Sequence, residues 1–301
     1  MTRHFTDIDD LSREELLEVL DRAADYKRKQ RAGTPHPDLE RQTLGMLFQK
    51  PSTRTRVSFE TGMTQLGGHA VFLGERDIQL GRGEPLRDTA RALSGYVDAI
   101  MARVFEHANV EELARYAGVS VINGLTDDAH PCQTLADLLT IRETFGELEG
   151  RSVAWVGDAN NVARSLALGC ALCGIDLTVA TPPEYALDDT VIERADSLGR
   201  APETTDDPDA AVAGADVVYT DVWISMGQED QRDHRLSAFE DFQVNEELLA
   251  NAADARVMHC LPAHRGEEIT DEVIEGDWSL IFEQAENRLH AQKGLLSFLL
   301  E

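Results

Sequence analysis

The sequence predicts an α/β protein built from two doubly wound parallel-sheet domains. Short apolar runs alternate with helical patterns along the whole chain, and this alternation restarts after a glycine-bounded break at 146–150. The chain has 301 residues, of which 42% are hydrophobic, so two domains of ordinary size can each bury a core. We expect domains at 1–146 and 147–301, with the last helix (about 285–301) packing back on the first domain. Loops at the carboxyl ends of the strands are then expected to bind ligands in a cleft between the domains.

The individual elements follow from the same patterns. Ser12 and Glu15 form a capping box that predicts the start of a helix, which Gly33 ends. Further helices are expected near Thr53, near Leu86, at an Asn109 cap, at 132–146, at 162–173 and at 281–300. Buried strands are expected at 44–48, 70–73, 99–103, 119–123, 152–156, 177–180, 217–220 and 256–259. The acid-rich stretch 202–209 is interpreted as a solvated loop.

The charge balance is strongly acidic, with 55 Asp and Glu against 28 Lys and Arg and a formal net charge of -27. A chain of this charge repels nucleic acid and anionic membranes, so neither is an expected partner. Only four of the basic residues are lysine, and the other 24 are arginine. This composition is typical of adaptation to a salty cytoplasm, as in halophilic archaea.

The N-terminal sequence MTRHFTDIDD contains no apolar signal region, and no stretch approaches the roughly 20 apolar residues of a membrane span. We therefore expect a cytoplasmic protein. Four cysteines in a chain of this length predict no disulfide framework. Cys170 and Cys173 form a C-x-x-C within an apolar helical run, which favours core packing over a redox or zinc site.

The strongest local motif is Ser52-Thr53-Arg54-Thr55-Arg56, which directly follows an expected strand and opens an expected helix. A helix N-terminus offers free N–H groups and about half a positive charge, so this motif suits a phosphate dianion. A plain helix cap with surface arginines is the alternative. The segment has no G-K-[ST] sequence, which argues against a nucleotide P-loop.

Several motifs together resemble the aspartate and ornithine carbamoyltransferase superfamily. S-T-R-T-R is similar to its carbamoyl phosphate motif, His130-Pro131-Cys132-Gln133 to its H-P-x-Q, and Met101-Ala102-Arg103 to its strand-terminal arginine. Four further segments resemble the ornithine branch of this superfamily. They are Asp158-Ala159-Asn160-Asn161, Asp221-Val222-Trp223-Ile224-Ser225-Met226-Gly227, His259-Cys260-Leu261-Pro262 and Glu286-Asn287-Arg288. The resemblance extends from about Phe5 to the C-terminus.

The resemblance implies a carbamoyl-phosphate-binding domain at 1–146 and an ornithine-binding domain at 147–301, with no metal and no organic cofactor. Ornithine would accept the carbamoyl group to give citrulline, in arginine biosynthesis or breakdown. The implied carbamoyl phosphate ligands are Ser52, Thr53, Arg54, Thr55, Gln79, Arg103, His130, Gln133, Cys260, Leu261 and Arg288. The implied ornithine ligands are Asn161, Asp221, Ser225 and Met226. The implied catalytic residues are Thr55, Arg103, His130, Cys260 and Arg288.

The family also implies a homotrimer or an assembly of trimers, with Gln79 reaching the phosphate of a neighbouring subunit. The loop 223–235 is interpreted as a lid over ornithine, and Arg56 as structural. Three alternatives remain open: a transferase for putrescine, aspartate or an N-acylated ornithine, a catalytically silent binding protein, and an NAD-dependent dehydrogenase. The V-G-D-A-N-N turn suggests the dehydrogenase, but it lacks G-x-G-x-x-G.

The net charge of -27 leads to a testable expectation about salt. Surface charges interact over roughly 10 Å at 0.1 M salt but only over ~3 Å at 1 M. The protein should therefore unfold as salt falls toward about 0.1 M, which circular dichroism across a salt series would detect. Full stability in dilute buffer would contradict the halophilic interpretation.

Overall fold

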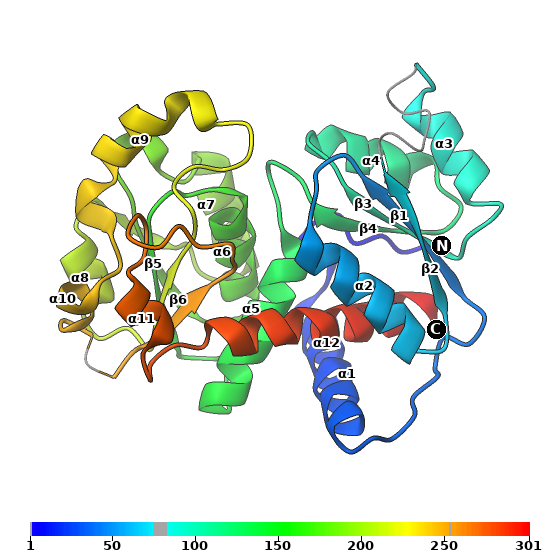
Figure 1. The fold of residues 1–301 in the computed structure, drawn as a ribbon, viewed down its shortest axis with the longest axis horizontal. Coiled ribbons are helices and arrows are strands. Elements are labelled where there is room, and N and C mark those ends of the chain that lie inside the picture. The colour runs from blue at the N-terminus through cyan, green and yellow to red at the C-terminus, as the bar shows by residue number, and fades with distance from the viewer. Residues whose placement is uncertain (1, 75–82, 253) are drawn as a thin grey trace. The chain divides into compact units, whose positions relative to one another are not determined.

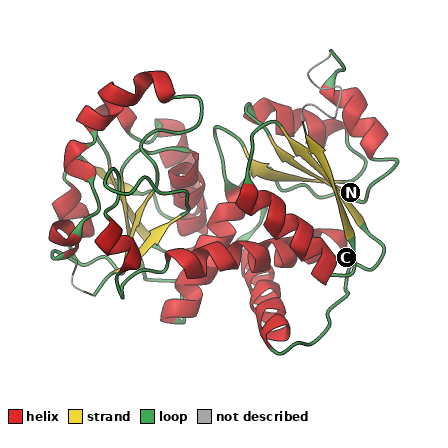
Figure 2. Cartoon of the chain, in the orientation of Figure 1, coloured by secondary structure: helices red, strands yellow, loops and turns green. Residues whose placement is uncertain are grey.

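The computed structural model describes residues 2–74, 83–252 and 254–301. The chain divides into two compact units, which we describe separately: a first unit of Met1–Leu139 with Glu286–Glu301, and a second unit of Thr140–Ala285. Each unit contains one parallel sheet with helices on both of its faces (Figures 1 and 2). The predicted fold class, two parallel-sheet α/β domains, is confirmed.

The sheet of the first unit has the strand order β2-β1-β3-β4. Its strands are β1 (Thr43–Phe48), β2 (His69–Gly74), β3 (Ala99–Arg103) and β4 (Ser120–Leu125). The helices are η1 (Ile8–Asp10), α1 (Arg13–Arg31), α2 (Thr53–Gln65), α3 (Leu86–Leu93), α4 (His107–Tyr116), α5 (Pro131–Phe145) and α12 (Ile281–Leu300), of which α5 and α12 continue into the second unit. Because Phe48 pairs with Arg103 and Arg103 with Leu125, three strands end together at one edge. The loops that follow them start from a common place.

Local sequence signals predicted most of this unit. The predicted capping box is present at the start of α1: the Ser12 side chain accepts from the Glu15 N–H, and the Glu15 side chain accepts from the Ser12 N–H. Gly33, beyond the end of the helix, has a φ of 67°. The predicted helix start at Asn109 is wrong, because α4 begins at His107 with Glu106 as its N-cap. The Asn109 N–H already bonds the Glu106 carbonyl at 3.1 Å, so the first turn forms before the residue that resembled a cap.

The sheet of the second unit has the order β7-β6-β5-β8-β9. Its strands are β5 (Ser152–Val156), β6 (Asp176–Ala180), β7 (Glu203–Thr205), β8 (Val217–Thr220) and β9 (Arg256–His259). The helices wholly inside this unit are α6 (Asn161–Cys173), η3 (Pro183–Tyr185), α7 (Asp189–Leu198), α8 (Pro208–Val212), η4 (Glu229–Gln231), α9 (Arg232–Ala238), η5 (Glu240–Phe242), α10 (Glu246–Leu249) and α11 (Asp271–Glu275). Within the described ranges, no helix combines the length and apolar character needed to cross a membrane.

Two predictions for the second unit need correction. The stretch 202–209 is not all loop, because Glu203–Thr205 forms β7 at the sheet edge and Pro208 begins α8. An edge strand tolerates exposed acidic side chains, so its composition resembles that of a loop. The second half of the segment 223–235 is likewise helical, since η4 and α9 cover 229–238. Cys170 and Cys173 are free thiols on α6, each 1% exposed, which confirms their packing in the core.

Helix α12 packs against α1 with its polar side chains buried. A Cβ on Gly294 would lie 2.4 Å from the Val19 carbonyl oxygen, so the two helices approach too closely for any larger residue. The Lys27 ammonium donates to Asn287 at 2.6 Å, and the Lys293 ammonium donates to Gln30 at 2.9 Å. These bonds satisfy charges that burial would otherwise make costly.

His290 on α12 gives this interface a predicted pH dependence. Burial, followed by the charges of Lys293 and Lys27, lowers the pKa of His290 to about 4, although Glu286 at 3.5 Å opposes the shift. Because the folded pKa lies below the ordinary value of 6.5, the unfolded chain binds the proton better. His290 therefore contributes stability above pH 6.5 that is lost as pH falls toward 4.

The substitution His290→Gln should flatten this dependence between about pH 6.5 and 4. Urea unfolding in high salt at several pH values measures it, with His69→Gln as the control because His69 is exposed. An equal acid dependence in His290→Gln and the wild-type protein would contradict the assignment.

Candidate active site

The carboxyl edge of the first sheet gathers most of the predicted carbamoyl phosphate residues from the loops after β1, β3 and β4, which are neighbouring strands of the sheet. Ser52 follows β1 and caps α2, where its side chain accepts a hydrogen bond from the Thr55 N–H at 3.2 Å. Arg103 ends β3, and His130 immediately precedes α5, which follows β4. Thr53 is exposed and Arg54 is half-buried in the first turn of α2. The edge thus presents a helix N-terminus, hydroxyls and guanidinium groups, all of which suit an anion.

Arg288 joins this edge from α12 at the other end of the sequence. Its guanidinium is 3% exposed and donates to Gln133 Oε1 at 2.6 Å and to Thr55 Oγ1 at 3.2 Å. The Arg288 Nη1 atom also lies 3.5 Å from His130 Nε2. Arg288 belongs to the first unit, as do the three residues that it contacts.

The orientation of the Gln133 amide is set by a residue that sequence reasoning missed. Gln133 Nε2 donates to Asp137 Oδ1 at 2.8 Å, and both side chains are buried. An ionised carboxylate only accepts hydrogen bonds, so the NH₂ end must face Asp137 and the carbonyl end must face Arg288. Asp137 lies one helical turn after Gln133 on α5, a spacing that could have indicated the pair.

His130 is held in its neutral form. Burial, followed by the positive charges of Arg288, Arg103 and Arg54, lowers the pKa of His130 well below its usual value of 6.5. A neutral imidazole carries one N–H donor and one acceptor nitrogen. At neutral pH, His130 can therefore donate a hydrogen bond to a carbonyl oxygen without adding another cation to the site.

The carboxyl edge of the second sheet holds Asp221 of the predicted ornithine set, directly after β8, in contact with Cys260, which we predicted as a carbamoyl phosphate ligand. The Asp221 carboxylate accepts from Asn160 Nδ2 at 2.8 Å and from the Cys260 thiol at 3.0 Å. Asn160 caps α6, and Cys260 follows β9, so three strand ends contribute to this cluster. The arrangement leaves a fixed carboxylate beside a thiol, which suits recognition of an ammonium group.

A second buried carboxylate supports this cluster and was not among the predicted site residues. Asp158 accepts from Arg235 Nη1 at 2.9 Å, and the same nitrogen donates to the Trp223 carbonyl at 2.7 Å. The pKa of Asp158 is raised to about 6, because burial and the charge of Asp221 together outweigh the opposing effect of Arg235. The Arg235 side chain therefore anchors the start of the segment that we interpreted as a lid.

The loop after β9 is held by a buried imidazole. His259 Nδ1 accepts from the Leu261 N–H at 2.9 Å, while Nε2 lies 3.0 Å from a Glu268 carboxylate oxygen. This pairing requires the proton on Nε2. Leu261 has a φ of 59°, a left-handed conformation that a leucine adopts only when its surroundings impose it. His259 thus fixes the backbone direction around Cys260 and Leu261.

The remaining predicted residues have simpler surroundings. Asn161 is half-buried as the first residue of α6. The Ser225 N–H binds the Gln228 side chain at 3.0 Å, and Met226 is exposed. Gln79 lies outside the described residues. The structure brings Asp221 and Cys260 into contact, while Ser225 and Met226 lie on the loop that follows β8.

Two groups of metal-type ligands occur among the described residues. Asp221, His259 and Cys260 form one group, and His264, Glu267 and Glu268 form the other, with ligand atoms within 4.8 Å of one another in each. In the first group, both His259 nitrogens and both Asp221 oxygens already have protein partners. In the second, Glu268 is bound to the His259 ring and to the His264 N–H. Hydrogen bonding accounts for the closeness of these groups.

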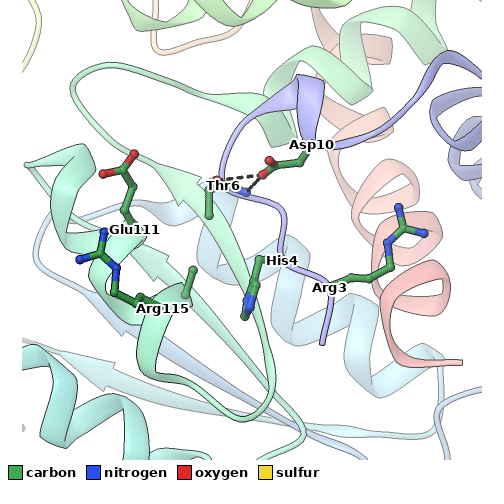
Figure 3. Close-up of a pocket in the computed structure, with 7 residues that line it drawn as sticks. Arg3, His4, Thr6, Asp10, Glu111 and Arg115 are labelled. Atoms are coloured by element: carbon green, nitrogen blue, oxygen red, sulfur yellow. Dashed lines mark hydrogen bonds between the residues drawn. The ribbon is translucent and has the colours of Figure 1, made fainter. Parts of the chain in front are cut away.

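An open pocket elsewhere on the first unit is a separate feature (Figure 3). Its lining comes from the N-terminal segment and α4: Arg3, His4, Thr6, Asp10, Glu111, Ala114 and Arg115. Asp10 is engaged by the Thr6 N–H and hydroxyl, and Arg3 pairs with Glu15 at 2.8 Å. None of the predicted site residues lines this pocket, so we do not assign the chemistry to it.

Two family models match the two halves of the chain. The family model for the carbamoyl-P binding domain of aspartate/ornithine carbamoyltransferase matches residues 3–143, and the model for its Asp/Orn binding domain matches 149–299. An ornithine carbamoyltransferase from Haloquadratum walsbyi is 64% identical over 99% of this chain and 97% of its own length. This relative supports the expected halophilic origin.

Solved structures give the same result. The chain superposes on the ornithine carbamoyltransferase of Pyrococcus furiosus with a TM-score of 0.95 and 53% identity, covering 98% of this chain and 96% of that one. The enzyme of Thermus thermophilus gives a TM-score of 0.90 and 44% identity with full coverage of both chains. The chain belongs to the aspartate/ornithine carbamoyltransferase family of enzymes.

Proposed function

We propose that the protein transfers the carbamoyl group of carbamoyl phosphate to the side-chain amine of L-ornithine, giving L-citrulline and phosphate. The observation that carries the proposal is the junction of Arg288 with Gln133 and Thr55 beside a neutral His130. This junction places cationic and neutral hydrogen-bond donors at one sheet edge, as an anionic acyl donor requires. The 64% identical relative carries the name ornithine carbamoyltransferase, which supports the choice of acceptor.

The first step in the proposal is capture of the phosphate at the N-terminus of α2. Ser52, Thr53 and Arg54 would hold it through hydroxyl, backbone N–H and guanidinium donors. The helix dipole favours the two negative charges and continues to favour them as charge collects on the departing phosphate. Carbamoyl phosphate is already activated, so this binding needs no ATP.

The second step is polarisation of the carbamoyl carbonyl. Arg103 and His130 would donate to its oxygen, and Thr55 can join them because its hydroxyl accepts from Arg288 and keeps its own hydrogen free to donate. Gln133 Oε1 has a second lone pair for the carbamoyl NH₂ group, which distinguishes this substrate from an acyl phosphate. The Arg288 guanidinium would stabilise the negative charge of the tetrahedral intermediate.

The ornithine backbone groups would bind in the second unit. The carboxylate of Asp221 would accept from the α-ammonium, with Ser225 and the Met226 backbone completing the contact. Asn161, in the first turn of α6, would donate to the α-carboxylate. Cys260 and the Leu261 carbonyl would contact the δ-amine, whose pKa of about 10.4 in water must fall before it can attack.

The transfer balances without another reactant. The neutral δ-nitrogen forms a bond to the carbamoyl carbon, and the bond from that carbon to the phosphate oxygen breaks. The leaving phosphate takes the electron pair of that bond and accepts the proton released by the nitrogen. A desolvated site favours this route, because water would otherwise compete for the carbamoyl group.

The proposal extends to assembly and context. We propose a homotrimer or an assembly of trimers, in which Gln79 reaches the phosphate of a neighbouring subunit. We place the protein in the cytoplasm and in arginine metabolism, in either the biosynthetic or the catabolic direction. A carbamoyltransferase for putrescine or N-acetylornithine is the second candidate, because the first-unit residues do not select the acceptor.

The function is tested by assaying carbamoyl transfer from carbamoyl phosphate in high-salt buffer to ornithine, putrescine, N-acetylornithine and aspartate in parallel. We expect product with ornithine alone. Product only with another amine would retain the carbamoyl phosphate site and overturn the acceptor. No product with any amine, from protein shown to be folded, would overturn the proposed activity.

Arg54→Gln should raise the KM for carbamoyl phosphate by roughly 10- to 100-fold, since a hydrogen bond to a charged group contributes about 1.5–3 kcal/mol. Arg56→Gln is the matched control, because Arg56 pairs with Glu60 at 2.9 Å on the same helix. Steady-state kinetics at saturating ornithine gives both values. Equal effects of the two substitutions on this KM would contradict the assignment of Arg54 to the phosphate site.

Asp221→Asn should raise the KM for ornithine by a similar factor and leave carbamoyl phosphate binding unchanged, because it removes the charge that pairs with the α-ammonium. The exposed Asp189 on α7 supplies the control, Asp189→Asn. Ornithine titrations at saturating carbamoyl phosphate measure the effect. If Asp221→Asn weakens both substrates together, Asp221 is structural.

A further inference from the structure

Lys50 is one of only four lysines in the chain, and it lies at the carboxyl edge of the first sheet. Its side chain is 5% exposed and forms an ion pair with Asp127. Its ammonium also lies 4.6 Å from the centre of the Phe105 ring. Neither Lys50 nor Asp127 is among the residues to which we assigned a contact with substrate.

These three residues come from three different loops. Lys50 lies between β1 and α2, Phe105 between β3 and α4, and Asp127 between β4 and α5. The loops are also joined through their backbones, since the Gln49 N–H binds the Arg103 carbonyl at 2.9 Å and the Asp127 N–H binds the Phe105 carbonyl at 2.8 Å. The Lys50 ammonium contacts both other loops, through Phe105 and through Asp127.

Each loop carries part of the candidate site within a few residues of this contact. Ser52 is two residues after Lys50, Arg103 is two residues before Phe105, and His130 is three residues after Asp127. The phosphate group of carbamoyl phosphate would bind at the first loop, and its carbonyl oxygen would bind Arg103 and His130. The spacing between the loops therefore has to match the length of the substrate.

We propose that Lys50 is a positioning residue, which sets the distance between the phosphate-binding and carbonyl-binding loops through its contacts with Asp127 and Phe105. This inference rests on the proposed function. A lysine suits the place because the ammonium is compact and fits beside a ring in a confined volume, whereas a guanidinium is planar and larger.

A positioning role makes a specific prediction about two ligands. Carbamoyl phosphate bridges the loops, whereas inorganic phosphate needs the first loop alone. Lys50→Met, which keeps the aliphatic stem and removes the charge, should raise the KM for carbamoyl phosphate about tenfold, or roughly 1.4 kcal/mol. The inhibition constant of inorganic phosphate should change by less than about threefold. Lys50→Arg should restore the KM only in part.

Asp127→Asn tests whether Lys50 affects the KM for carbamoyl phosphate through its ion pair with Asp127. Asp127 is 54% exposed, so its loss should raise the same KM in the same direction but less. The double variant should be no worse than Lys50→Met alone, because both changes break one contact. Lys29→Met controls for the loss of a lysine ion pair outside the candidate site, since Lys29 pairs with Asp25 at 2.8 Å on α1 with its side chain 36% exposed.

The kinetics are measured in high salt, with thermal unfolding recorded for every variant. The inference is overturned if Lys50→Met keeps the wild-type KM for carbamoyl phosphate. It is also overturned if phosphate and carbamoyl phosphate weaken equally, because that pattern indicates a general loss of structure. Absence of any ornithine-dependent product from the wild-type protein would instead contradict the proposed function, so the two failures are distinguishable.

Discussion

The hydrogen bonds from Arg288 to Gln133 and Thr55 are the contact on which the candidate carbamoyl phosphate site depends. They attach the C-terminal helix to the first turns of α2 and α5 at the sheet edge, and they place a buried cation beside His130. A buried guanidinium is tolerated only where such partners satisfy it. The close packing of α12 on α1, which Gly294 permits, holds Arg288 at that place. The distant end of the sequence is therefore required for a site whose other residues are nearly all encoded before residue 140.

The same arrangement reconciles an acidic protein with an anionic substrate. The net charge of -27 opposes anion binding at long range, but salt screens it over a few ångströms. Inside the site, Arg54, Arg103 and Arg288 act on His130 at short range, and the last two are buried, where charges interact more strongly than in water. Burial of the ring and the positive charges of these arginines keep His130 neutral, so the histidine adds a directed hydrogen bond without adding charge that would need a further partner.

Sequence patterns predicted the parts of this structure that depend on local order. Strands β3, β5, β8 and β9 have the predicted bounds. Parallel strands form short, nearly continuous apolar runs, which are easy to recognise in a sequence. The edge strand β7 was missed because its composition matches a solvated loop. The motifs also predicted that Ser52, His130 and Asp221 follow strands, and these residues come after β1, β4 and β8 in sequence. The contacts of Lys50 and Arg235 were not foreseen, since each joins residues that no motif relates, and a long-range pairing leaves no periodic signal in one sequence. The contact between Gln133 and Asp137 was missed although its spacing of one helical turn could have indicated it.

A nitrogen-15 NMR titration of the histidine side chains tests the central claim, that burial together with the arginines at the first sheet edge keeps His130 neutral. The His130 signal can be assigned by comparison with His130→Asn. We predict that it remains that of a neutral imidazole from pH 8 down past the usual histidine pKa of about 6.5. A titration of His130 centred near that value would show that neither burial nor the three arginines lowers the pKa of the ring, and would contradict the site as described.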